Sequence, residues 1–308
     1  MTAAREFDVI VAGELYTDLI LSGFDFWPQP GQEAFARNFH RVAGGGTSIT
    51  ACGLARLGSR TSVLGVVGSD GAWLREQLNN SGVDTHSIAV HPSEPTAFTV
   101  AVTAPEDRAF ISYAGANRGF ATALEAAAAR GELARARHVH LAYAPALDTV
   151  RELFRAIRDN GCTLSLDVGW HEAWLSDPRA MEALSLVDIY FPNETEGRCM
   201  TGESDPVFSL RRFADMGLRR VALKLGARGA VLLWDDRILT AEPYAAQPVD
   251  TTGAGDCFDA GFLYAWLQGE TPERCLQSGN LCGARSTEAY GGTAGMPDEA
   301  CWKREMGI

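Results

Sequence analysis

The chain contains 308 residues, 46% of them hydrophobic and 21% charged, which is the composition of an ordinary globular protein. This length is sufficient for one large α/β domain or for two small ones. The formal net charge of −12 repels nucleic acid and anionic membranes, so neither is an expected partner.

Targeting and redox signals both favour a cytoplasmic protein. The apolar run at residues 9–13 is too short for a signal peptide, and no stretch is long enough to span a bilayer. The cysteines are odd in number and form no Cys-x-x-Cys pair; they are Cys52, Cys162, Cys199, Cys257, Cys275, Cys282 and Cys301. We therefore expect small, buried and reduced cysteines rather than disulfides.

Short β-rich runs alternate with helical patterns along most of the chain, which is typical of βαβ units in a mainly parallel sheet. The predicted strands are residues 8–13, 61–67, 138–142, 163–167, 188–191, 221–225 and 230–234. The predicted helices are residues 47–57, 72–81, 122–136, 149–160, 193–201, 206–216, 254–268 and 272–290.

Two stretches lack the helix that should follow each strand of a parallel sheet. Residues 19–42 contain strand-like pieces around Trp27-Pro28-Gln29-Pro30-Gly31. Residues 95–113 alternate like a hairpin whose turn is Pro105-Glu106-Asp107. Both stretches would fit a small antiparallel sheet attached to the main one.

The most informative stretch is Asp250-Thr251-Thr252-Gly253-Ala254-Gly255-Asp256-Cys257-Phe258, between a β-favouring segment and a long apolar helix. Glycines at a helix N-terminus let bare backbone N–H groups face an anion, and the helix dipole favours negative charge there. Asp256, in the first turn of that helix, is a potential proton acceptor. An anion cradle beside a base is what phosphoryl transfer to a hydroxyl requires. The stretch is no Walker A loop, because no Lys-Ser/Thr follows the glycines.

This stretch resembles the C-terminal motif of the ribokinase-like (PfkB) carbohydrate kinases. A second motif agrees with it, because Gly44-Gly45-Gly46 opens a helix that closes on Leu54-Ala55-Arg56-Leu57-Gly58. The resemblance implies one α/β domain over residues 1–308, with a mainly parallel central sheet between helices. The two exceptional stretches, about residues 15–42 and 93–114, would form the small antiparallel β lid that covers the substrate in the family.

The resemblance also implies an activity, ATP-dependent transfer of a phosphoryl group to a hydroxyl of a small sugar. Asp256 would take the hydroxyl proton, and the N–H groups of Gly253, Ala254 and Gly255 would hold the transferring group. ATP and Mg²⁺ are the expected cofactors. Whether a monovalent cation binds beside the Asp250-Thr251-Thr252 segment stays open.

Further matches assign the nucleotide and metal residues. The expected ATP-binding residues are Lys224, Gly226, Gly229, Thr252 and Asn280. Asn193 and Glu196 match an Asn-x-x-Glu motif that helps the family place Mg²⁺ through water, and the spacing favours Glu196 over Glu194. From the residues alone, the same pair is equally a capped helix with an acidic first turn.

The acceptor side shows two departures from the family. Asp18, Gly44, Gly45 and Asp167 are the expected acceptor-binding residues. Ile49, however, stands where the family usually has Asn, so either Thr47 or Ser48 takes over or the acceptor is less polar there. Gly169 and His171 replace the Asn and Arg that follow this Asp in several keto-sugar kinases. This second departure argues against 2-keto-3-deoxygluconate or fructose as the acceptor.

Several alternatives remain. The first is a nucleoside kinase of the same family, which Ile49 and Trp170 keep open. The second is a nucleotide- or sugar-binding regulator without turnover, against which the intact Asp256 argues. A vitamin-type kinase of the same superfold fits less well. Because lids of this kind often pair in the family, a homodimer through the lid is a further expectation.

Overall fold

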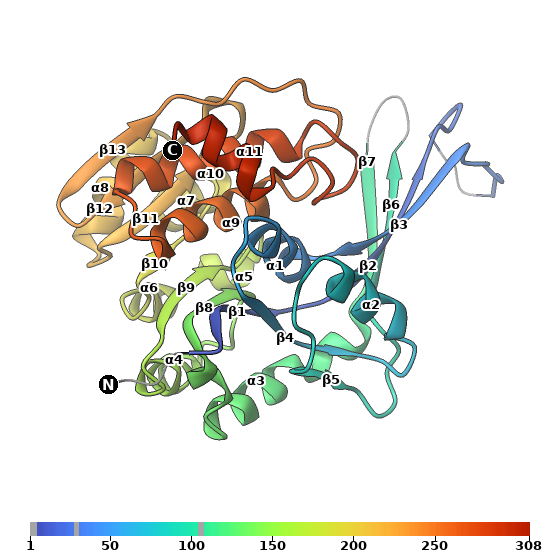
Figure 1. Ribbon diagram of the computed structural model, residues 1–308, viewed down its shortest axis with the longest axis horizontal. Helices are drawn as coiled ribbons and strands as arrows, with labels where there is room; N and C mark the ends of the chain where they lie inside the picture. The colour runs from blue at the N-terminus through green and yellow to red at the C-terminus, as the bar shows by residue number, and fades with distance from the viewer. Residues whose placement is uncertain (1–4, 28–30, 104–107) are drawn as a thin grey trace.

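A nine-stranded sheet forms the centre of the computed structural model, which describes residues 5–27, 31–103 and 108–308 (Figure 1). Its strand order is β13-β12-β11-β10-β9-β8-β1-β4-β5. The bounds are β1 Phe7–Gly13, β4 Thr61–Val67, β5 Ile88–Val90, β8 Ala136–Ala142, β9 Thr163–Asp167, β10 Ile189–Tyr190, β11 Arg220–Lys224, β12 Ala230–Trp234 and β13 Arg237–Ala241. All neighbours from β11 to β5 are parallel, whereas β11, β12 and β13 pair antiparallel.

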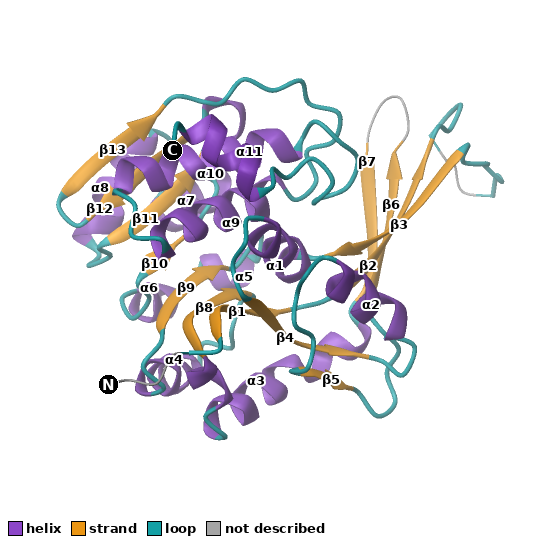
Figure 2. Cartoon of the chain, viewed as in Figure 1, coloured by secondary structure: helices purple, strands orange, loops and turns teal. Residues whose placement is uncertain are grey.

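Helices cover both faces of this sheet (Figure 2). Their bounds are α1 Gly46–Arg56, α2 Ala72–Asn80, α3 Phe120–Ala129, α4 Val150–Asp159, α5 Glu172–Leu175, α6 Pro178–Leu184, α7 Glu194–Thr201, α8 Pro206–Asp215, α9 Ala254–Leu267, α10 Pro272–Ser286 and α11 Glu299–Met306. Short 3₁₀ helices are η1 Gly115–Gly119, η2 Glu132–Arg135 and η3 Gly226–Arg228.

Alternate side chains of β1 are buried against the two helical layers on opposite faces of the sheet. Ile10 and Ala12 pack into one hydrophobic cluster with α3, α4, α6 and α8. Val9 and Val11 point to the opposite face and pack into a second cluster with α1, α2, α9, α10 and α11. A strand that is apolar on both sides is the pattern of a parallel sheet between two helical layers.

A separate four-stranded sheet, which we call the lid, projects from the main body at the right of Figure 1. Its strands are β2 Tyr16–Ser22, β3 Asn38–Gly44, β6 Phe98–Thr103 and β7 Arg108–Tyr113, in the order β3-β2-β6-β7. The two outer pairings are antiparallel, and the inner one, between β2 and β6, is parallel. The turn predicted at residues 105–107 lies outside the described residues.

Most predicted elements are present, and three strands have the predicted bounds: β4, β9 and β12. The predicted helix at 122–136 is wrong at its C-terminal end, because α3 ends at Ala129 and Gly131 adopts a left-handed φ of 72°. The helix predicted to reach residue 290 ends at Ser286. Elements β5, β13, α5, α6 and α11 were not predicted, since they are short or lie at an edge with few buried residues.

Within the described residues, every helix falls short of the length and apolar character that crossing a membrane would need.

Candidate active site

A cavity of about 450 Å³ lies at the carboxyl ends of the central strands, where α/β sheets bind their ligands. Residues that directly follow or end β1, β8, β9 and β11 line it, as does the N-terminus of α9. The predicted site residues that it brings together are Asp167, Asn193, Glu196, Lys224, Gly226, Gly253, Ala254, Gly255 and Asp256. Glu14, Tyr16, Gly46, Ala142, Val168, Gly169 and Thr251 complete the lining.

The anion cradle predicted at the start of α9 has the required backbone. Gly253 is the N-cap residue, with a left-handed φ of 72°. A Cβ atom there would lie 2.8 Å from Ile49 Cδ1 and 2.9 Å from Gly292 Cα, so only glycine fits. Asp250 holds the preceding turn, because one carboxylate oxygen accepts hydrogen bonds from Thr252 N at 3.0 Å and Thr252 Oγ1 at 2.7 Å.

Asp256 lies in the first turn of α9 and lines the cavity. Burial raises the pKa of its carboxyl group to about 7; the Asp167 carboxylate adds to this shift, and Lys224 opposes it. A carboxylate that titrates near neutral pH is suited to general base catalysis, because it is ionised at working pH and still binds a proton well.

Lys224, at the end of β11, is held in place by two carboxylates. Its Nζ atom donates to Asp167 Oδ2 at 2.6 Å and lies 3.2 and 3.3 Å from the two oxygens of Asp259. Burial acts against its charge, but the Asp167 and Asp259 carboxylates raise its pKa above the ordinary value. A Cβ atom on Gly255 would lie 3.4 Å from Nζ. The ammonium group is therefore placed directly beside the anion cradle.

Sequence reasoning missed Asp259, whose side chain has no exposed surface. Its one sequence signal is its spacing, three residues after Asp256 and so on the same face of α9. Asp167, which was predicted to bind the acceptor, lines the cavity, and its oxygens also accept hydrogen bonds within the protein, Oδ2 from Lys224 Nζ and Oδ1 from Gly169 N at 2.8 Å. The structure thus places Asp167 and Asp259 as partners of Lys224.

Asn193 and Glu196 form a reciprocal capping box at the start of α7. Asn193 Oδ1 accepts from Glu196 N at 2.9 Å, and Glu196 accepts from Asn193 N at 2.8 Å and from Asn193 Nδ2 at 2.6 Å. Burial raises the pKa of Glu196 to about 7, with a smaller contribution from Asp167. The two residues therefore do cap the helix, and both side chains also line the cavity. Glu194 instead pairs with Arg228 at 2.6 Å, at the exposed surface.

Each glycine of Gly44-Gly45-Gly46 packs against a different side chain. A Cβ atom on Gly44 would lie 2.1 Å from the Asp18 carboxylate, one on Gly45 would lie 3.0 Å from the Tyr16 ring, and one on Gly46 would lie 2.7 Å from Asp256 Oδ1. A side chain at Gly44 or Gly46 would force the neighbouring carboxylate to move, and the left-handed φ of 79° at Gly45 also favours glycine. The turn therefore contacts both the lid strand β2, through Asp18 and Tyr16, and Asp256 of α9.

The remaining predicted site residues lie outside the lining of this cavity; they are Asp18, Gly44, Gly45, Gly229, Thr252 and Asn280. Asn280 Nδ2 donates to Ala241 O at 3.3 Å and to Glu242 O at 3.0 Å, which anchors the segment after β13. Gly229 packs beside the same amide group. Ile49 is buried under Gly253. Of the residues considered in its place, Thr47 and Ser48 have buried hydroxyls with no hydrogen-bond partner in the described part of the chain.

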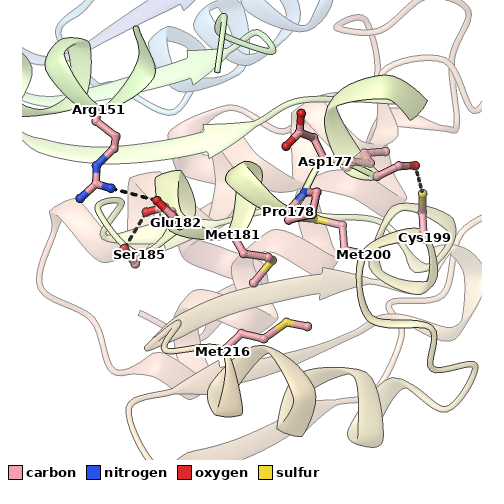
Figure 3. Close-up of a pocket in the computed structure, with 11 residues that line it drawn as sticks. Arg151, Asp177, Pro178, Met181, Glu182, Ser185, Cys199, Met200 and Met216 are labelled. Carbon is pink, nitrogen blue, oxygen red and sulfur yellow. Dashed lines mark hydrogen bonds and ion pairs between the residues drawn. The ribbon is translucent and has the colours of Figure 1, made fainter. Parts of the chain in front are cut away.

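A second cavity, of about 790 Å³, has different chemistry (Figure 3). Met181, Met200 and Met216 line it, and Arg151 at its rim pairs with Glu182 at 2.9 Å. It has no glycine-rich turn and no buried carboxylate in its lining. The features expected of a phosphoryl-transfer site are thus found in the cavity at α9 and not in the lining of this second cavity.

Across the described residues, no group of three or more His, Cys, Asp or Glu side chains is arranged to hold a metal ion by itself. Mg²⁺ usually keeps several waters and binds through one or two carboxylates together with substrate phosphates. The oxygen donors of Glu196 and Asn193 in the cavity fit that mode.

Comparison with known proteins gives one family and several relatives. The model described as pfkB family carbohydrate kinase matches residues 7–299. The chain is 31% identical to a nucleoside kinase of Methanothermobacter thermautotrophicus, over 94% of this chain and 93% of that one. It is 30% identical to a 2-dehydro-3-deoxygluconokinase of Bacillus subtilis, over 84% and 85%. The structure of Arabidopsis thaliana ribokinase complexed with ribose and ATP superposes with a TM-score of 0.84 at 25% identity, covering 98% of this chain and 99% of that chain.

Proposed function

This chain belongs to the pfkB family of carbohydrate kinases, and from that premise we propose that it transfers the γ-phosphoryl group of ATP to a primary hydroxyl of a small neutral sugar. The observation that carries the proposal is the anion cradle at the start of α9 with Asp256 in the same turn, both lining one cavity. The named relatives act on different acceptors, so similarity alone does not choose among them.

In the proposed reaction, Asp256 accepts the proton of the acceptor hydroxyl while its oxygen attacks the γ-phosphorus. A new O–P bond forms, the bond to the β-phosphate oxygen breaks, and ADP leaves. The backbone N–H groups at the start of α9 stabilise the transferring group. Gly253 and Gly255 provide the better placed donors, because Ala254 N already makes a long hydrogen bond, 3.3 Å, to Thr251 O.

Lys224 supplies fixed positive charge beside the cradle and would pair with a phosphate of ATP. Mg²⁺, when bound with ATP, neutralises phosphate charge, and Glu196 and Asn193 would hold it through water. Gly226 lines the nucleotide side of the same cavity, and Gly229, Thr252 and Asn280 would support that side from behind.

At the acceptor end, Asp18 would bind hydroxyl groups next to the Gly44-Gly45-Gly46 turn. A nucleoside is the second candidate acceptor. It is favoured by Trp170, which is 58% exposed and directly follows the cavity residue Gly169, where its ring is available to stack on a base.

ADP release from the purified protein tests the proposal, measured with ATP and Mg²⁺ against a panel of neutral sugars and nucleosides. We expect release that depends on the acceptor, with product that carries the phosphoryl group. Binding of ATP without acceptor-dependent release by any panel member would instead favour a regulator without turnover.

Two finer proposals concern the surroundings of the site. A monovalent cation beside Asp250 and Thr252 would tune the anion cradle, and a comparison of activity in K⁺ and Na⁺ tests it. A homodimer would form through the lid, whose strands expose Phe39, Phe110 and Ile111. Molecular mass in solution tests this second proposal.

We also place the protein in the cytoplasm, because the cysteines of the described residues are all free thiols.

A further inference from the structure

Glu14 and Tyr16 line the cavity but have no part in the reaction proposed above. Glu14 directly follows β1, and Tyr16 is the first residue of the lid strand β2. The Tyr16 hydroxyl donates to Glu14 Oε2 at 3.0 Å. This hydrogen bond orients the Glu14 carboxylate and leaves its second oxygen available to another donor.

The backbone between these two residues is clamped. Asn117, a buried residue of η1, accepts from Leu15 N at 3.1 Å and donates to Leu15 O at 3.1 Å. The Leu15 side chain has no exposed surface. Glu14 and Tyr16 are therefore held in place from both sides before any ligand binds.

The pair lies close to the reacting groups. The Tyr16 ring packs against Gly45, and the neighbouring Gly46 packs against Asp256 Oδ1. Asp256, Gly46, Tyr16 and Glu14 line one cavity, so an acceptor whose hydroxyl reaches Asp256 would lie next to this pair. Asp18 approaches the same turn at Gly44.

The charges around this end of the cavity are mostly negative. Glu14, Asp18 and Asp256 surround the glycine turn, and the nearest lysine, Lys224, is already paired with Asp167 and Asp259. In the part of the chain that the structure describes, no arginine lines the cavity, and the histidine that acts electrostatically on Glu14 is the exposed His171. Partial burial strengthens interactions between charges, so an anionic group placed here is repelled.

We propose that Glu14, oriented by Tyr16, selects the acceptor by charge: it accepts a hydrogen bond from a hydroxyl or protonated amino group and excludes anionic acceptors. The inference rests on the proposed kinase function and adds to it a specificity-determining residue and a substrate class, neutral or cationic polyols. A carboxylate accepts such hydrogen bonds strongly, and specificity commonly uses a repulsive element against the wrong partner.

Three probes test the proposal, each with a primary hydroxyl at C6: glucose, glucosamine and gluconate. Each is measured as a substrate, or as a competitive inhibitor of the best acceptor found, with wild type, Glu14→Gln and Tyr16→Phe. Gluconate differs from glucose in shape, but that difference cancels when its ratio to glucose is compared between wild type and variant. Glu152→Gln, an exposed glutamate of α4, is the control for the same change of charge.

For Glu14→Gln we expect the preference for glucose over gluconate to fall about tenfold and the preference for glucosamine over glucose to fall by a similar factor. The KM for ATP should stay within about twofold of wild type. Tyr16→Phe should change both acceptor preferences in the same direction but by a smaller factor, and Glu152→Gln should change neither preference.

The possible failures are distinguishable. Acceptor-dependent ADP release with the charge preferences unchanged in Glu14→Gln would overturn this inference and leave the kinase function standing. Equal changes in Glu152→Gln would also overturn it, because net charge alone would then explain them. No release with any acceptor, in wild type and variants alike, would overturn the kinase proposal and this inference with it.

Discussion

The burial of Asp256 and the charges of its neighbours determine the pKa of its carboxyl group. Asp256 lies on the first turn of α9, against Gly46 of the turn before α1. Its pKa is raised to about 7 by burial and by Asp167. An ordinary exposed aspartate would be a much weaker base. Two consequences for activity can be measured separately at this residue.

The first consequence at Asp256 concerns removal of the proposed base. Asp256→Asn should lower kcat by roughly 10²–10⁴ while the Kd for ATP stays nearly unchanged, because the amide keeps the shape but accepts no proton. Steady-state kinetics and calorimetric ATP titration measure the two quantities, with Asp215→Asn on the exposed face of α8 as the control. Turnover within about threefold of wild type would exclude Asp256 as the base.

The second consequence at Asp256 concerns the pH dependence of kcat/KM for the acceptor. Since the raised pKa leaves Asp256 protonated below about pH 7, kcat/KM for the acceptor should rise as pH increases and level off above this value. A carboxyl group with an ordinary pKa would instead give a flat profile from about pH 5 upward. A flat profile in that range would contradict the raised pKa.

Glu196 and Glu194 offer a matched pair on one helix. Glu196→Gln should raise the Mg²⁺ concentration needed for half-maximal activity, because it removes a buried carboxylate that lines the cavity. Glu194→Gln should not, since Glu194 pairs with Arg228 at the surface. Mg²⁺ titrations of both variants provide the measurement, and identical curves would remove Glu196 from the metal site.

At the scale of elements, the site depends on two glycine-rich turns that meet at Asp256. The turn before α9 would provide the anion cradle of the proposed reaction, and the turn before α1 packs against Asp18 and Tyr16 of the lid strand β2. The glycines of the two turns contribute no side chain of their own. Both act by keeping space empty next to groups that come from other elements, so branched side chains should be tolerated in neither.

Gly255→Val tests the first turn. The added side chain would start 3.4 Å from Lys224 Nζ and extend into the cradle, so phosphoryl transfer should be abolished while acceptor binding changes little. Kinetics for ATP and a direct titration with the acceptor separate the two effects. Unchanged kcat/KM for ATP would mean that the turn is purely structural.

At the scale of the whole molecule, the lid and the main sheet contribute to one site. The main sheet places Asp167 and Lys224, and the lid strand β2 places Tyr16 and Asp18. In the proposed function, Asp18 of the lid binds the acceptor and Lys224 of the main sheet pairs with ATP. A change in the lid should affect one substrate and not the other.

Asp18→Ala is the test of that separation. We expect kcat/KM for the acceptor to fall about tenfold or more, through loss of a charged hydrogen-bond acceptor, with the Kd for ATP almost unchanged. The two constants are measured in the same preparation. Equal weakening of ATP and acceptor would show that Asp18 supports the site only generally.

The sequence alone was sufficient for the family, the fold class and most central strands. Each of these depends on local pattern: short β-rich runs at β4, β9 and β12, and a motif of nine consecutive residues at the start of α9. Family membership and the kinase fold are confirmed by the family match and by the superposition on ribokinase. The individual roles of the site residues stay predictions.

Only the tertiary structure decided which side chains meet. Lys224 and Asp167 are 57 residues apart in the chain, and they pair because β9 and β11 end at the same edge of the sheet with β10 between them. Asn117 clamps Leu15 from 102 residues away. No local periodicity encodes such contacts, since they depend on strand order and on how the lid folds back. For the same physical reason Asp259, Glu14 and Tyr16 became visible as parts of the site only in three dimensions.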